Sequence, residues 1–233
     1  MENKKTIIGI IILVILIIAV AVISYLYNEF STKQLNILTN ETNKLLQADI
    51  TTEEIDFKIK SEKKYAIVEK AIKEYLSKLQ NIHKEIKETN QNINPNDIFS
   101  AKNIEDKNFD DIDEIIVSYK EKGNNAIVEY EELVKEENIL KNIEQKEISK
   151  YYIDLYKTAM LSDVMKSKYD ILKNEIEKQK DELTDTLTSL ERIEKYLEDN
   201  EKYWTTKDDK IQFTNINIMT QYYNLLNELV DKN

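Results

Sequence analysis

The feature that most constrains this chain is a long apolar run near its first residue, from Ile7 to Tyr27. Between Ile7 and Ile23 every residue except Gly9 is Ile, Leu, Val or Ala. As an α-helix the whole run is roughly 31 Å long, which matches a bilayer hydrocarbon core of about 30 Å. No charged residue interrupts it. The run therefore predicts a transmembrane helix within residues 6–27, with the lipid bilayer as its partner.

The charges on either side of the run predict its orientation. Lys4 and Lys5 precede it, whereas Lys33 is the first basic residue after it. Because basic flanks stay in the cytoplasm, we expect residues 1–5 to form a cytoplasmic tail and everything after Tyr27 to be extracytoplasmic. The expected location is therefore the cell membrane, in a single-pass arrangement.

A cleaved signal peptide is the alternative interpretation of the same run. Residues 19–21 (Ala-Val-Ala) have the small-x-small form of a cleavage site, and cleavage there would release a secreted protein. The apolar run continues beyond this site through Val22 to Leu26, which favours an anchor. A buried helix of a soluble core is the weakest interpretation, because the run has no polar face.

Composition predicts an all-α fold for the remainder of the chain. The 233 residues are 41% hydrophobic and 33% charged, with only 2 glycines and 1 proline, whereas strand-rich folds need both at their turns. The net charge of −11 argues against nucleic acid as a partner, because such a surface repels phosphate. The absence of cysteine excludes disulfides, thiolate nucleophiles and thiolate metal ligands.

Helical spacing of apolar residues divides the remainder into about four main helices. The strongest stripe keeps an unbroken three-four spacing, as in a coiled coil. It comprises Tyr65, Val68, Ile72, Tyr75, Leu79, Ile82 and Ile86. Further stripes cover residues 109–133, 165–197 and 218–229. Helices of this kind joined by short connections are expected to form an elongated antiparallel bundle.

The intervals around these stripes predict the domain organisation. Leucines at helical spacing extend the membrane helix to about Gln47. Residues 28–60 are accordingly expected to be a stalk and linker, and residues 61–233 an exported bundle domain.

Two local features qualify this pattern. Gly123 lies inside the second stripe, so we expect one continuous helix there, with Gly123 as a close-packing point. Residues 204–213 break the helical spacing and predict a small non-helical turn or hairpin, with Asp208-Asp209 at its tip.

The chain offers little catalytic chemistry. His83 is the only histidine, and we expect it to be partly exposed and to play no metal or acid-base role. A helical zinc site needs a second histidine, a di-iron site would need an acid at Gln80, and a phosphate loop needs more glycines. The dense acids of residues 110–114 are expected to start a helix, where they complement its dipole and cap its free N–H groups. We therefore predict no enzyme activity, no cofactor and no metal site.

Aromatic residues give the candidate binding surface. Tyr151, Tyr152, Tyr156 and Trp204 are its members, because Tyr and Trp dominate binding sites, although their commoner role is at the edge of a core. The leading hypothesis is a membrane-tethered interaction or structural module of the cell envelope, with a protein partner or self-association. The alternative is a sensor-like module that binds a small ligand or glycan in an aromatic cleft between helices.

Three stretches of the sequence resemble a group of bacterial proteins. They are Tyr65 to Leu76 (YAIVEKAIKEYL), Tyr151 to Leu161 (YYIDLYKTAML), and the closing stretch with Trp204, Ile211-Gln212-Phe213 and Tyr223-Asn224. They resemble uncharacterised proteins of low-GC Gram-positive bacteria with one N-terminal membrane segment and a helical remainder. The resemblance covers most of the chain and implies this topology, but no activity.

Overall fold

The chain folds into helices and one small hairpin. The computed structural model describes the backbone of residues 2–208 and 210–230 and the side chains of residues 19–208 and 210–229. In chain order the elements are α1 (Glu2–Gln47), α2 (Lys63–Gln91), α3 (Pro95–Ile98), α4 (Asp110–Leu133), α5 (Glu136–Glu144), α6 (Lys150–Met160), α7 (Asp163–Asp199), the 3-10 helix η1 (Glu201–Tyr203), β1 (Trp204–Lys207), β2 (Lys210–Phe213) and α8 (Ile216–Val230). The mainly helical fold that the composition predicts is confirmed.

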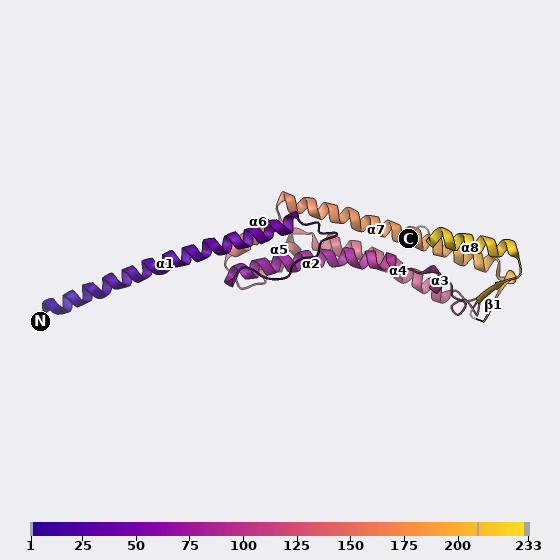
Figure 1. Ribbon diagram of the computed structural model, residues 1–233, viewed down its shortest axis with the longest axis horizontal. Coiled ribbons are helices and arrows are strands. Elements are labelled where there is room, and N and C mark those ends of the chain that lie inside the picture. The colour runs from indigo at the N-terminus through magenta and orange to yellow at the C-terminus, as the bar shows by residue number, and fades with distance from the viewer. Residues whose placement is uncertain (1, 209, 231–233) are drawn as a thin grey trace.

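The helices form an elongated bundle from which α1 projects as a rod (Figure 1). We call the end where α1 enters the bundle the proximal end, and the end with the hairpin the distal end. The long helices α2, α4 and α7 pack against one another along the bundle, and α8 folds back over the last part of α7. Helix α4 runs antiparallel to α7, since Tyr130 near its end bonds Tyr169 near the start of α7. The predicted elongated helical bundle is thus present.

The stripe from Tyr65 to Ile86 is buried along its whole length in α2, as its spacing predicts. Ala71 and Leu76, next to the stripe, are buried as well. A helix buried over so wide a face needs neighbours on several sides, and α2 contacts α1, α4, α6 and α7. It is therefore the central helix of a bundle rather than half of a two-stranded coiled coil.

Buried apolar side chains form two cores, one after the other along the bundle. The proximal core joins the end of α1, most of α2, the second half of α4, α5, α6 and the first half of α7. It is rich in buried tyrosines, namely Tyr65, Tyr75, Tyr130, Tyr156 and Tyr169. The distal core joins α3, the first half of α4, the second half of α7, Trp204 and α8, and it is mainly aliphatic.

Gly123 marks a close approach of α4 to α7. An ideal Cβ at this position would lie 2.9 Å from Cδ2 of Leu183, whereas carbon atoms pack best at about 3.5–4.0 Å. Helix α4 continues unbroken from Asp110 to Leu133. The prediction of one helix with a close-packing glycine is confirmed.

The non-helical unit predicted for residues 204–213 is an antiparallel hairpin. Trp204 pairs with Phe213, and Lys207 pairs with Lys210. Asp208 at the turn has a φ of 51°, a left-handed conformation that aspartate tolerates better than most residues. Residue 209, the other predicted turn residue, lies outside the described residues.

Residues 28–60, predicted as a stalk and linker, pack in part against the bundle. Helix α1 ends at Gln47, as the leucine spacing predicts. Leu38 and Ile50 are nevertheless part of the proximal core, and the side chain of Glu41 is buried. The leucine spacing does not reveal the full extent of this packing, because part of the buried face of α1 is polar.

Helix α1 also departs from the antiparallel pattern. Ser31 bonds Tyr65, and further along both helices Glu41 approaches Lys73, so α1 and α2 run in the same direction. The segment 48–62 makes this possible because it runs back to the proximal end before α2 begins (Figure 1). A connection of this length frees consecutive helices from the antiparallel arrangement that short loops impose.

Most of the predicted membrane segment, Ile7 to Tyr27, lies outside the residues whose side chains are described, because those of residues 1–18 are not. The backbone of α1 is helical from Glu2 onward through this segment. Over the described part of the chain, we find no helix with an apolar stretch long enough to cross a bilayer.

Candidate functional site

A buried polar cluster fixes α1 to α2. It consists of Glu41 from α1, Lys60 and Ser61 from the segment before α2, and Glu69 and Lys73 from α2; we call these five residues the clamp. Four of them are buried, and Lys60 reaches in from the surface. The clamp thus joins three separate parts of the chain in one network of charged and polar groups.

Lys73 lies at the centre of the clamp. Its side chain is 1% exposed, and its Nζ donates to Oε1 of Glu69 at 2.8 Å. The same Nζ donates to the backbone carbonyl of Lys58 at 2.7 Å and lies 3.7 Å from Oε2 of Glu41. A buried ammonium group therefore has partners from α1, from the segment 48–62 and from its own helix, which is what its burial requires.

Glu69 holds the segment before α2 in place. It accepts hydrogen bonds from the backbone N–H of Lys60 at 3.1 Å and from the N–H and hydroxyl of Ser61 at 2.8 and 2.6 Å. Burial acts to raise the pKa of Glu69, but the bonds from Lys73 and these donors outweigh it and leave the pKa lowered. Glu69 is therefore a stable anion at neutral pH.

Glu41 brings α1 into this network. Its Oε1 accepts from Lys44 at 2.7 Å and its Oε2 from Lys60 at 2.8 Å. Burial acts to raise its pKa, and the two lysines more than offset this and lower it. Detachment of α1 would take the Glu41 carboxylate away from the buried ammonium group of Lys73, so the clamp opposes this detachment.

Four tyrosines lie together at the proximal end; we call Tyr27, Tyr65, Tyr151 and Tyr152 the tyrosine cluster. The ring centroids of Tyr65 and Tyr152 are 5.1 Å apart, as are those of Tyr151 and Tyr152, both in edge-to-face geometry. The hydroxyl of Tyr65 is 2.6 Å from Oγ of Ser31. Burial, and then the neighbouring hydroxyls of Tyr65 and Tyr27, raise the pKa of Tyr152. Two predicted site residues, Tyr151 and Tyr152, therefore adjoin α1.

The other two predicted site residues lie in different cores. Tyr156 is fully buried in the proximal core. Trp204 is 1% exposed in the distal core, and its Nε1 donates to the backbone carbonyl of Leu197 at 2.8 Å. The structure thus corrects the prediction of one shared aromatic surface. The large apolar area of these two rings stabilises the cores, as the competing interpretation expects.

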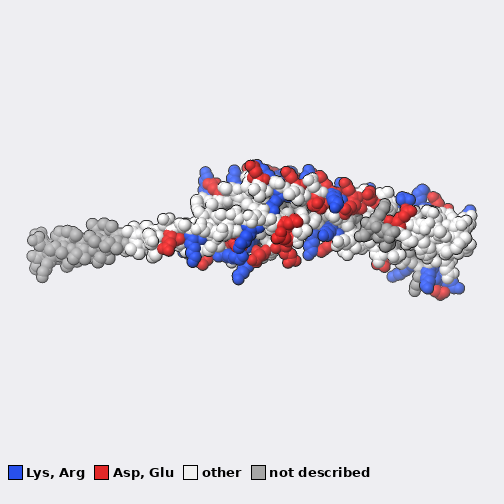
Figure 2. Space-filling model, turned by 45° about the horizontal axis from the view of Figure 1, so that its top comes forward, with Lys and Arg blue, Asp and Glu red and all other residues white. Residues whose placement is uncertain are grey.

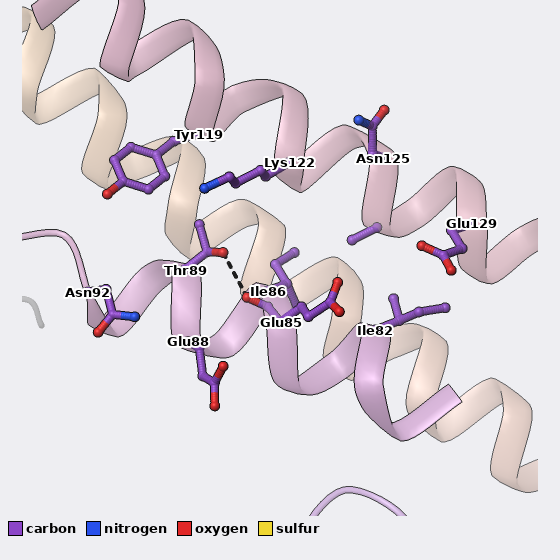
Figure 3. Close-up of a pocket in the computed structure, with 11 residues that line it drawn as sticks. Ile82, Glu85, Ile86, Glu88, Thr89, Asn92, Tyr119, Lys122, Asn125 and Glu129 are labelled. Carbon is purple, nitrogen blue, oxygen red and sulfur yellow. Dashed lines mark hydrogen bonds between the residues drawn. The ribbon is translucent and has the colours of Figure 1, made fainter. Parts of the chain in front are cut away.

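An open groove of about 530 Å³ lies between α2 and α4 (Figure 3). Ile82 and Ile86 of α2 contribute its apolar part, and both are buried. From α4, Tyr119 and Lys122 line the groove, with Nζ of Lys122 5.2 Å from the Tyr119 ring centroid. Acidic side chains of both helices, Glu129 among them, line the groove together with uncharged polar ones. The groove therefore combines a small apolar strip with charges of both signs.

His83 is buried, with 7% exposure, rather than partly exposed as predicted. It borders a hollow that α2 forms with residues 50–57. The helical spacing of apolar residues in α2 does not reveal that these residues pack against the helix. Burial, and then the nearby charge of Lys87, lower its pKa, so the imidazole is neutral at pH 7. Among the described residues, no group of three or more His, Asp or Glu side chains could hold a metal ion.

The acids of residues 110–114 lie at the start of α4, as predicted. The residue before them, Phe109, makes no side-chain cap, and Oδ1 of Asn108 accepts from the backbone N–H of Asp110 at 3.1 Å instead. The acids of residues 110–114 therefore stabilise α4 through the helix dipole rather than through capping hydrogen bonds.

The clamp is the feature that sequence reasoning missed. Glu69 and Lys73 are four residues apart beside the buried Ile72, and this spacing is the available signal. Lys70 and Glu74 have the same spacing on the same helix, yet both remain in solvent. Spacing therefore cannot tell a buried pair from an exposed one.

Charge is distributed unevenly over the molecule. Figure 2 shows acidic and basic side chains intermixed along the bundle, whereas the described part of the rod just outside the bundle is mostly uncharged.

Comparisons with protein-family models, with curated proteins and with solved structures find no match.

Proposed function

We propose that the protein is a single-pass membrane protein whose helical bundle stands outside the cytoplasm and serves as an interaction or structural module of the cell envelope. The apolar run from Ile7 to Tyr27 supports the anchor, and Lys4 and Lys5 support the orientation. The continuity of α1 from this run into the bundle supports a direct connection between the two.

The clamp is the observation that carries this proposal. A tether that only keeps a domain near a membrane works through a flexible linker and needs no specific contact. Here one continuous helix enters the bundle, where buried Glu41 lies 3.7 Å from buried Lys73 of α2 and pairs with Lys60 of the segment before α2. Anchor and bundle therefore act as one stiff unit, which suits a module that holds a partner at a set distance from the membrane.

Cysteine labelling in cells tests the orientation. Because the chain has no cysteine, a single Thr205→Cys variant gives a clean signal with a membrane-impermeant maleimide. We expect it to react in intact cells, whereas an Asn3→Cys control reacts only after lysis. Reaction of Thr205→Cys only after lysis would contradict the proposed topology.

Cross-linking in living cells tests the role as an interaction module. We expect discrete cross-linked species that contain a partner or a second copy of the chain, identified after purification from membranes. A protein that always remains alone and monomeric under these conditions would refute this part of the proposal.

The alternative function, a sensor-like module for a small ligand or glycan, is best accommodated by the groove between α2 and α4. A thermal-shift screen of the purified full chain tests it. A ligand of the groove should raise the Tm of the wild type but not that of Tyr119→Ala or Lys122→Ala. If no compound raises the Tm, this alternative loses its support.

A further inference from the structure

The bundle begins almost where the predicted membrane segment ends. Ser31 of α1 is 2.6 Å from the hydroxyl of Tyr65, and Nζ of Lys63 lies 4.3 Å from the ring centroid of Phe30. Ser31 is about one helical turn beyond Tyr27, or about 6 Å along the axis. The headgroup layer adds about 5–8 Å on each side of the hydrocarbon core. A bundle joined to α1 at this height therefore reaches the headgroups.

The proximal end carries aromatic side chains that are open to solvent. Tyr151 is 48% exposed, and Tyr25 and Tyr27 on the adjacent turn of α1 are 68% and 63% exposed. Tyrosine is enriched at the boundary between lipid and water, where its ring lies in the apolar layer and its hydroxyl stays hydrated. The exposure of these tyrosine rings, which is unfavourable in water, is therefore favourable at the level of the headgroups.

The same end is also basic, in contrast to the protein as a whole. The segments 61–65 and 145–152 contain four lysines and two glutamates, whereas the chain has a net charge of −11. All four lysines are exposed, namely Lys63, Lys64, Lys146 and Lys150. A local excess of lysine next to a membrane helix attracts anionic headgroups.

We propose that this proximal face rests on the outer leaflet of the anchoring membrane, with its lysines against headgroup phosphates and its exposed tyrosines in the interface. The inference rests on the proposed function, because it requires α1 to lie in the bilayer. The clamp fixes α1 and α2 together. Contact of the proximal face with the membrane therefore sets the height and direction of the distal end.

Single-cysteine variants of the full chain test the contact. Ser149 is exposed beside Lys150 and its side chain caps nothing, whereas Thr205 is exposed at the distal end. Ser149→Cys and Thr205→Cys are each labelled with a fluorophore. They are then reconstituted in vesicles of equal parts phosphatidylglycerol and phosphatidylcholine that also contain a lipid with a nitroxide on its headgroup. We expect the nitroxide to remove most of the emission from position 149 and none from position 205.

A charge comparison identifies the lipid chemistry. The variant Lys63→Gln/Lys64→Gln/Lys150→Gln should lose much of the quenching at position 149. The matched control Lys84→Gln/Lys178→Gln/Lys195→Gln removes the same charge from exposed sites along the bundle and should keep it. In pure phosphatidylcholine the wild type should show the weaker quenching of the first variant.

Flotation of the same vesicles separates this inference from the proposed function. If the protein floats with the vesicles but the label at position 149 is not quenched, the base is held clear of the membrane and the inference is wrong while the anchor stands. Equal loss of quenching in both triple variants would also overturn it. If the protein does not float with the vesicles, the proposed anchor itself fails.

Discussion

The two cores of the bundle differ most in how they treat a buried charge. In the proximal core, Lys73 and Glu69 are each 1% exposed and fully paired. In the distal core, Glu194 is 7% exposed, and the charges that act on it are all acidic. Burial, and then the nearby Asp113, raise the pKa of Glu194 to about 7. One core has its charges neutralised, and the other keeps a carboxyl group that prefers to be protonated.

The difference reflects what each core joins. The proximal core must hold α1, which arrives from outside the bundle and runs parallel to α2, and directional polar contacts specify that register in a way that apolar contacts do not. The distal core packs Trp204 against Phe109 and the end of α7, with α8 against α7, and it needs little beyond apolar packing. We expect four variants to test this contrast.

The largest effect is expected at the clamp. Lys73→Met leaves Glu69 buried without its ammonium partner and should lower the free energy of unfolding by about 3–5 kcal/mol. Lys70→Met on the same helix removes an exposed lysine and should cost less than about 1 kcal/mol. Denaturant unfolding of the full chain in detergent micelles, followed by circular dichroism, measures both. Equal costs would show that the clamp contributes no more than a surface pair.

The junction of the cores should be sensitive to added volume. Gly123→Val places side-chain atoms against Leu183, where even a Cβ is too close, and should cost about 1–3 kcal/mol. Asn124→Val on the exposed face of α4 is the matched control and should change stability by about 0.5 kcal/mol or less. If both variants unfold at the same denaturant concentration, α4 and α7 do not approach closely at this point.

The buried carboxyl group of Glu194 in the distal core should give a pH signature. Because the folded pKa of Glu194 is raised from 4.5 to about 7, the folded state binds its proton more tightly, and stability falls as the pH rises through this interval. Glu194→Gln should therefore be more stable than the wild type at pH 8, by about 1–2 kcal/mol once solvent screening is allowed for. The gain should vanish below pH 4.5. Denaturant midpoints at pH 8 and pH 4 measure it, and a gain that persists at pH 4 would contradict this cause.

The smallest effect is expected from a surface pair of the distal half. Arg192 and Glu228 are 4.0 Å apart, with both side chains more than half exposed. Arg192→Ala should change the free energy of unfolding by about 0.5 kcal/mol or less, because solvent screens such pairs. A loss as large as that of Lys73→Met would mean that burial does not separate strong pairs from weak ones in this protein.

The elements that could be predicted from the sequence are those that the spacing of apolar residues along the chain indicates. The three-four stripe of α2 can be read directly because burial of one helical face repeats with the helical period. Gly123 could be assigned to a continuous helix because the stripe keeps its phase across it, despite turn-forming neighbours. The break at residues 204–213 was visible for the converse reason, since Trp204 and Phe213 do not fit that phase.

The tertiary structure alone decided which of these faces meet. Nothing local to Glu41 and Lys73 indicates that α2 lies beside α1, because their contact depends on the path of segment 48–62. Trp204 and Tyr156 belong to different cores for the same reason, although each reads as a surface candidate in isolation. The helical spacing of apolar residues specifies which side of a helix is buried. Which other helix packs against that side depends on the length of chain between the helices and on three-dimensional packing.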